Sequence, residues 1–146
     1  MAGNTRKEEN RLLVTVSNKP LENFMGEPFK LQWYDDALDK VVLRHADMVL
    51  ALRTFLRTAA ADGRGNVVIK NMEDSQHARS LGVAFQQAED GALTMTLNDH
   101  KWLLAKFEES GHLAYPTDAA LLLDVLKATT ESRGVAPGGK EQPDAS

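Results

Sequence analysis

The stretch DGALTMTLNDHKWLLAKFEESGH, residues 90–112, decides the fold class that this sequence predicts. Its first part alternates apolar and threonine residues with the two-residue period of a half-buried strand, and the inward side is Leu93, Met95 and Leu97. A helix then follows, because Asn98 is a good N-cap and Asp99 favours the positive end of the helix dipole. Gly111 is expected to end this helix, whose apolar side consists of Trp102, Leu103, Ala105 and Phe107. The stretch therefore predicts a strand that runs directly into a helix.

Upstream of this stretch, two segments have the composition of strands and a third has the period of a helix. RLLVTVS (11–17) is β-branched and apolar, and FKLQW (29–33) alternates, so we expect these two to pair as a hairpin with a long loop. From residue 35 to about residue 60 the apolar side chains recur every three or four positions. That spacing predicts a long helix with His45 and Leu52 on its apolar stripe.

The remaining segments predict two further helices and a short strand. Residues 66–70, NVVIK, suggest the strand, and residues 72–88 predict a helix with Phe85 on its apolar face. Thr117 is a candidate N-cap for a final helix, whose apolar side is Leu121, Leu122, Val125 and Leu126. The predicted fold is α+β, in which a small antiparallel sheet, made of the N-terminal hairpin and one or two short strands, packs against four helices.

The two ends of the chain differ in composition from its centre. Residues 1–11 are polar, and residues 131–146 are rich in Gly, Pro and Ser with few apolar groups. Such segments bury too little apolar surface to offset the entropy of ordering them. We therefore expect flexible tails at 1–11 and 131–146 around a single domain at 12–130.

The composition argues against several classes of function. The chain of 146 residues has a formal charge of −4 and no cysteine, which excludes disulfides, thiolate metal sites and a Cys nucleophile. The negative charge argues against broad nucleic-acid binding. No apolar run approaches the ~18 residues of a membrane span, and the N-terminus has no apolar signal segment. We therefore expect a cytoplasmic protein without membrane contact.

Two stretches resemble cofactor motifs but fail at decisive positions. The segment from Asp62 has the length of a calcium loop, but Arg64 takes a ligand position and Val67 stands where the turn needs Gly. GVAPGGK from Gly134 matches a phosphate loop, but Glu141 follows where a hydroxyl residue is needed. The four histidines form neither a His-x3-His pair nor an HExxH pattern. The sequence therefore predicts no metal and no cofactor.

His45, His100 and His112 are the residues that a catalytic hypothesis would use. On an apolar helix stripe, the imidazole of His45 would have to find a hydrogen-bond partner. Asp99 and His100 are adjacent, and neighbouring helix residues point about 100° apart, so they do not form a ready-made pair. Either the three histidines are structural, or the fold brings one of them to an Asp or Glu in a small enzyme.

Aromatic and methionine side chains are candidates for a protein interface. Phe24 and Met25 lie in a turn-rich loop, where they are either exposed anchors or folded back beneath the sheet. Trp33 and Tyr34 follow shortly after this loop and are further candidates.

A basic edge offers a second kind of interface. Arg53 and Arg57 are one turn apart on the predicted long helix, and Arg64 follows it. This edge is either a solvated face or a docking patch for an acidic partner. Together with Lys70 it also supports an alternative, a weak nucleic-acid binder.

The order of the predicted elements resembles that of small accessory proteins of tailed bacteriophages. The resemblance covers roughly residues 12–127 and includes the strand pair, the two helices, LTMTLND and the closing YPTDAALLLDVL helix. It implies a non-enzymatic protein that binds a host enzyme or assists virion assembly in the host cytoplasm. No functional residue is carried over from it.

The leading hypothesis is therefore a non-catalytic protein-binding module. The sequence contains no complete catalytic set, and it offers aromatic, methionine and arginine side chains suited to an interface. The alternatives are a small enzyme that uses a His–carboxylate pair and a weak nucleic-acid binder that uses the arginine edge.

Overall fold

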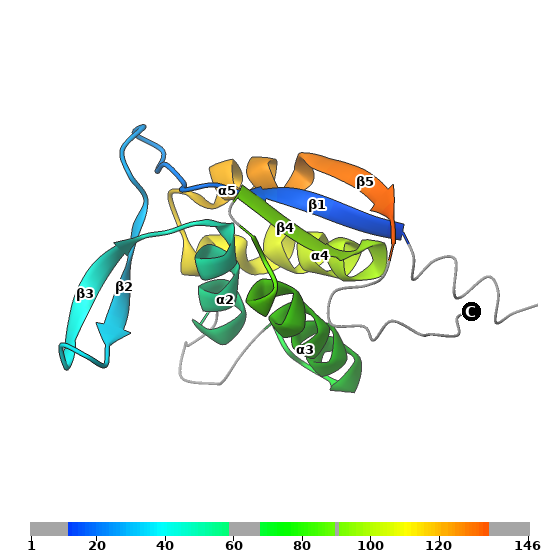
Figure 1. Cartoon of the computed structure of the whole chain (residues 1–146), viewed down its shortest axis with the longest axis horizontal. Coiled ribbons are helices and arrows are strands. Elements are labelled where there is room, and N and C mark those ends of the chain that lie inside the picture. The colour runs from blue at the N-terminus through cyan, green and yellow to red at the C-terminus, as the bar shows by residue number, and fades with distance from the viewer. Residues whose placement is uncertain (1–11, 59–67, 90, 135–146) are drawn as a thin grey trace, which may run out of the picture.

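The computed structural model describes residues 12–58, 68–89 and 91–134 (Figure 1). Within these ranges the elements follow in the order β1 (Leu12–Asn18), β2 (Lys30–Asp35), β3 (Lys40–His45), α2 (Met48–Thr58), α3 (Met72–Gln86), β4 (Gly91–Thr96), α4 (Leu97–Ala114), α5 (Ala119–Lys127) and β5 (Thr129–Arg133). The described part of the chain thus has the predicted α+β class, with small antiparallel sheets and four helices.

The main sheet has the strand order β4-β1-β5, and both of its pairings are antiparallel. Val14 lies opposite Met95 and Val16 opposite Leu93, and all four side chains are buried. The other face includes the Thr15 and Thr94 hydroxyl oxygens, which lie 2.8 Å apart, and also the buried side chain of Leu13. The face with Val14 and Val16 lies on the core, as one face of an antiparallel sheet commonly does.

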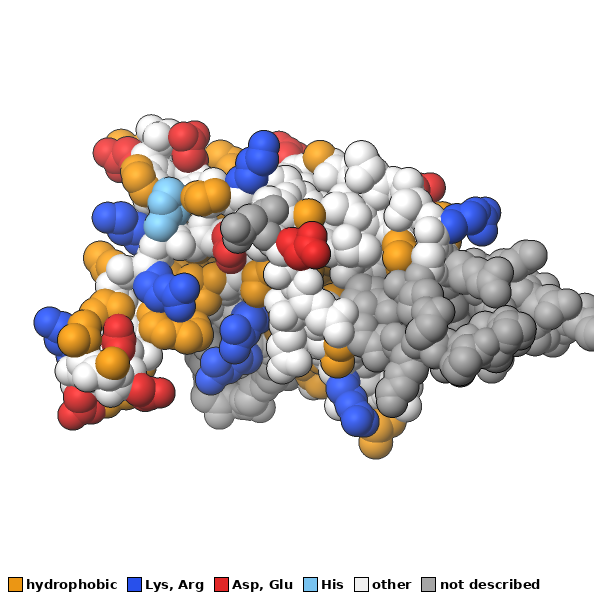
Figure 2. Space-filling view, in the orientation of Figure 1, with side chains coloured by type: hydrophobic (Ala, Val, Ile, Leu, Met, Phe, Trp, Pro, Cys, Tyr) orange, Lys and Arg blue, Asp and Glu red, His pale blue; other side chains and the backbone are white. Residues whose placement is uncertain are grey.

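The second sheet is a hairpin of β2 and β3, which we call the arm (residues 30–45). The arm extends from the side of the body, beyond α2 (Figure 1). At this end of the molecule, hydrophobic side chains are exposed among charged ones (Figure 2). A two-stranded hairpin has little stability by itself, so its contacts with the body matter.

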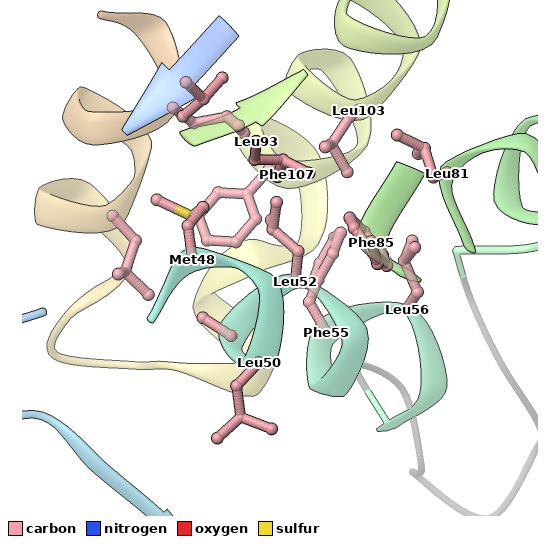
Figure 3. Close-up of a cluster of buried hydrophobic side chains, with 14 of the residues drawn as sticks. Met48, Leu50, Leu52, Phe55, Leu56, Leu81, Phe85, Leu93, Leu103 and Phe107 are labelled. Carbon is pink, nitrogen blue, oxygen red and sulfur yellow. The ribbon is translucent and has the colours of Figure 1, made fainter. Parts of the chain in front are cut away.

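The core lies between the apolar face of the main sheet and the helices. Side chains of α2, α3, α4 and β4 converge there (Figure 3), and they include Met48, Leu52, Phe55, Leu81, Phe85, Leu93, Leu103 and Phe107. Phe55 and Phe107 pack ring to ring with centroids 4.8 Å apart. Leu52 and Phe85 are buried, as their places on apolar stripes predict.

The predicted pairing of the first two strands is wrong. β1 pairs with β4 and β5, whereas β2 pairs with β3 across a turn at residues 36–39. A short local hairpin costs less chain entropy than a pairing across the longer loop from residue 19 to residue 29. As the central strand, β1 also needs partners on both edges, and these come from the second half of the chain.

The long helix predicted at residues 35–60 begins only at Met48, because residues 40–45 form β3. The Asp35 carboxylate accepts hydrogen bonds from the amides of Ala37 and Leu38, so it closes a turn and does not begin a helix. Asp47 caps α2 instead, since its carboxylate accepts the Leu50 amide at 2.9 Å.

Three further predictions about the helix ends need correction. The N-cap of α4 is Thr96 and not Asn98, because the Thr96 hydroxyl accepts the Asp99 amide at 3.1 Å. Leu97 therefore belongs to the helix and not to the strand. Helix α4 continues through Gly111 to Ala114, and the N-cap of α5 is Asp118, which makes no side-chain capping bond, and not Thr117.

The predicted boundary at residue 130 also moves, because residues 129–133 form β5 at the edge of the main sheet. Residues 68–70 contain no strand, while residues 66–67 of that prediction lie outside the described ranges. Residues 1–11 and 135–146 of the predicted tails lie outside them as well. In the described ranges, no helix has the length and apolar character needed to cross a membrane.

Candidate binding surface

The two faces of the arm differ in exposure. Residues that lie opposite each other in an antiparallel pair project to the same side, so Tyr34 and Val41 share the outer face with Gln32 and Leu43. The side chains of Tyr34, Val41 and Leu43 are 51%, 59% and 65% exposed. Neither Val41 nor Leu43 was a predicted interface residue, because both fell within the predicted helix.

The tip of the arm is held by its own hydrogen bonds. Asp39 has a positive φ of 52°, a conformation that Asp tolerates better than most residues. Its carboxylate accepts a hydrogen bond from the Tyr34 hydroxyl, and Asp35 accepts the amides of Ala37 and Leu38. The outer face therefore has a fixed shape without a partner.

The inner face of the arm fastens it to the body. Leu31 and Trp33 are half-buried and pack against the core cluster. The guanidinium carbons of Arg44 and Arg53 lie over the Trp33 ring, 4.9 Å and 5.9 Å from its centroid. The structure thus brings together two predicted interface residues, Trp33 and Arg53, in a cation–π contact. Trp33 is not an exposed anchor.

The loop before the arm exposes its aromatic and methionine side chains. Phe24 is 58% and Met25 66% exposed, so the alternative in which they fold back beneath the sheet does not hold. The Asn23 side chain accepts the amides of Met25 and Glu27, and the Phe24 amide donates to the Asp118 carboxylate at 2.8 Å. These bonds tie the loop to the start of α5.

The basic edge lies mainly on α2. Arg53 and Arg57 are exposed and one turn apart, as predicted, and Lys70 is exposed before α3. Arg64 lies outside the described residues.

The three histidines of the catalytic hypothesis do not meet carboxylates in the described part of the chain. His45 is exposed at the end of β3, not on a helix stripe, and its Nε2 lies 2.8 Å from the Leu21 carbonyl oxygen. His100 is buried, with Nε2 2.9 Å from the Leu126 carbonyl oxygen. His112 is exposed near the end of α4. All three positions are consistent with structural or surface roles.

The fourth histidine, His77, does contact a carboxylate. Sequence reasoning missed this contact. Nδ1 of His77 lies 2.8 Å from Asp99 Oδ1, and the Ser80 hydroxyl donates to Asp99 Oδ2 at 2.5 Å. The His77 ring stacks on Trp102 with centroids 5.2 Å apart. Because Ser80 bonds the carboxylate and not the imidazole, these residues do not form a Ser–His nucleophile pair.

A second carboxylate continues this network between α3 and α4. Asp74 accepts hydrogen bonds from Trp102 Nε1 at 2.8 Å and from the Lys70 amide at 2.9 Å, and Lys106 Nζ lies 3.1 Å away. The Trp102 hydrogen bond, helped by Lys70 and Lys106, lowers the pKa of Asp74 to about 2 against the opposing effect of burial. The network joins α3 and α4, so Asp99 has a role in helix packing besides the one that the sequence predicted, which was to favour the dipole of its own helix.

The spacing of the network residues can be recognised in the sequence. Asp74 and His77 are three residues apart on α3, and Asp99, Trp102 and Lys106 recur at three- and four-residue steps on α4. Each set lies along one helix face, but only the packing of the two helices brings them together. The described ranges contain no group of three or more His, Asp or Glu residues able to hold a metal ion.

Comparisons with known proteins identify no relative. No protein-family model, no curated protein and no solved structure matches this chain.

Proposed function

We propose that this chain is a protein-binding module and that it binds its partner through the outer face of the arm. The observation that supports this most directly is the exposure of Tyr34, Val41 and Leu43 together on one side of a two-stranded sheet. Exposed apolar side chains that are contiguous are typical of interaction sites, whereas isolated ones are ordinary.

The geometry of the arm suits this role. Its tip is fixed by Asp35 and Asp39, and Trp33 holds its inner face against the body. A surface that already has its bound shape loses less entropy on binding. In addition, β2 and β3 each have an edge that pairs with no other described strand, so a partner strand has backbone groups to bond.

The resemblance to accessory proteins of tailed bacteriophages supplies a class of partner for this proposal: a host enzyme or a virion component. The part of that resemblance that involves a long first helix is not found in the structure, since residues 40–45 are a strand. The segments from residue 72 onward keep the expected order of helix, strand and two helices.

The test compares polar variants of the arm with a matched control. Val41→Thr/Leu43→Thr places β-branched residues, which suit a strand, at both positions but removes apolar surface. Leu113→Gln changes another exposed apolar residue, on α4 and distant in sequence from the arm. Circular dichroism should show the native fold in both variants, and their free energies of unfolding should change by less than about 0.5 kcal/mol.

The partner is captured from the native host with a photo-cross-linking residue at position 43, using position 113 as the control. Its affinity for each variant is then measured by calorimetry with purified components. The double arm variant should bind at least about tenfold more weakly, a loss of about 1.4 kcal/mol. Equal affinity of the arm variant and the wild type, or equal cross-linking at positions 43 and 113, would contradict the proposal.

A further inference from the structure

A second surface lies between α2 and α3. These helices border a half-open groove of about 440 Å³, within the size range of ligand sites. Its floor is apolar, formed by Leu56, Phe85 and Gly82, and Arg53, Arg57 and Gln86 also line it. The groove therefore combines an apolar floor with a cationic rim.

The arginines of this groove are not neutralised by the described chain. Neither Arg53 nor Arg57 forms an ion pair with a described residue. Arg44 lies close to Arg53, because the guanidinium groups of both lie over the Trp33 ring. Three guanidinium groups therefore extend from the inner face of the arm to the groove, in a chain whose formal charge is −4.

Gly82 gives an independent indication that the groove is a site. It lies in the interior of α3, where glycine is about 1 kcal/mol less favourable than alanine. No atom of a neighbouring element requires a glycine there, because a Cβ added at Gly82 would have no such atom within 4 Å. Because Gly82 has no side chain, the floor of the groove stays open at this position.

We propose that the groove binds an acidic segment of a partner protein. An apolar side chain of that segment lies on Gly82 and Phe85, and neighbouring carboxylates bind Arg53 and Arg57, whose planar guanidinium groups match carboxylate geometry. The negative charge of the whole chain argues against nucleic acid as the occupant. The Trp33 ring is also covered by guanidinium groups and is not free to stack on a base.

This inference rests on the proposed function in that the occupant is a protein, but it uses a surface separate from the outer face of the arm. The probe is a library of short random peptides, selected on the immobilised full chain. Selection on the wild type should enrich Asp and Glu beside a large apolar residue. On Arg53→Glu/Arg57→Glu, the selected charges should change to Lys and Arg.

One enriched peptide is then measured by fluorescence anisotropy against variants that should all fold, because they change exposed or open positions. The arginine double variant and Gly82→Leu, which fills the groove, should each weaken binding at least about tenfold. The matched variant Gly82→Ala should have a smaller effect. Val41→Thr/Leu43→Thr should leave the peptide affinity unchanged within about twofold.

Three outcomes would overturn the inference. The first is a wild-type selection without acidic enrichment, and the second is a peptide affinity that Arg53→Glu/Arg57→Glu and Gly82→Leu leave unchanged. The third is tighter binding of a single-stranded oligonucleotide than of the peptide, lost in the arginine variant, which would assign the groove to nucleic acid. A peptide affinity that fell only in the arm variant would refute the groove while supporting the outer face.

Discussion

Asp74 is the residue whose ionisation should most clearly control the stability of the α3–α4 contact. Its carboxylate is buried and accepts hydrogen bonds from Trp102 Nε1, the Lys70 amide and Lys106 Nζ. The variant Asp74→Asn keeps the shape of the side chain and can still accept the Trp102 bond. It removes the charge that faces Lys106, and with it the dependence of this site on pH.

The size and sign of the effect follow from the pKa of Asp74, which is lowered from 3.8 to about 2, chiefly by the Trp102 hydrogen bond. A carboxyl group whose pKa is lower in the folded state stabilises that state above its unfolded pKa and loses this contribution as pH falls through the folded pKa. The difference between the two pKa values corresponds to about 2 kcal/mol. About two thirds of it should have disappeared at about pH 2.5.

The assay is urea unfolding of the wild type and Asp74→Asn between about pH 6 and pH 2.5. The wild type should be more stable at pH 6, and its advantage should shrink by roughly 1.5 kcal/mol at the acid end. Trp102→Phe keeps the ring on His77 but removes the N–H donor, so it should raise the pKa of Asp74 and reduce this pH dependence. An advantage that is constant with pH would refute the assignment of the lowered pKa to Asp74.

Four other substitutions test three features of the fold by chemical denaturation. Gly82→Ala should raise the free energy of unfolding by about 0.5–1 kcal/mol, since the helix gains propensity and the added methyl meets open space; a loss would show hidden crowding. Thr96→Ala should cost about 1 kcal/mol through loss of the cap, while exposed Asn98→Ala should be nearly neutral; the reverse order would restore Asn98 as the cap. Phe55→Ala should cost about 3–5 kcal/mol, because its buried ring packs on Phe107; a cost below about 1 kcal/mol would place Phe55 outside the core.

Local periodicity predicted those elements whose side chains face one large core. The strand at residues 91–96 alternates with period two, and Leu93 and Met95 are fully buried. The helix at residues 72–86 has its apolar stripe on the same core, with Phe85 inside it. In both cases the pattern of the sequence and the demand of the tertiary structure agree, so the fold class could be predicted.

The arm was missed because its sequence fits two periods. Leu38, Val41, Val42 and His45 are spaced as a helix stripe, yet the same residues belong to a hairpin. The deciding features are the Asp35 side chain that closes the turn, the positive φ of Asp39, and the pairing of Trp33 with Val42 across the strands. Of these features, only the pairing of Trp33 with Val42 depends on tertiary structure. Counting the helix and strand propensities of the residues takes none of the three into account.

The candidate surfaces were predictable only in part, for a related reason. The position of Arg53 beside Arg57 agrees with local sequence reasoning, whereas that reasoning left open whether Phe24 and Met25 are exposed, as they are in the structure. The outer face of the arm depends on the register between two strands, and the groove depends on how α2 meets α3. A single sequence contains the side chains of these surfaces but not their neighbours.

Helix α2 connects the two proposed surfaces. Leu52 and Phe55 are buried on one side of it, and the Tyr115 hydroxyl donates to the Ala51 carbonyl oxygen at 2.6 Å, so the helix has little freedom to shift. Arg53 therefore occupies a defined place from which it reaches both Trp33 of the arm and the groove. Because this frame is fixed before binding, a partner that contacts both surfaces loses little entropy in engaging the second one. It follows that losses of affinity from arm and groove variants should add, unless the arm moves relative to α2 on binding.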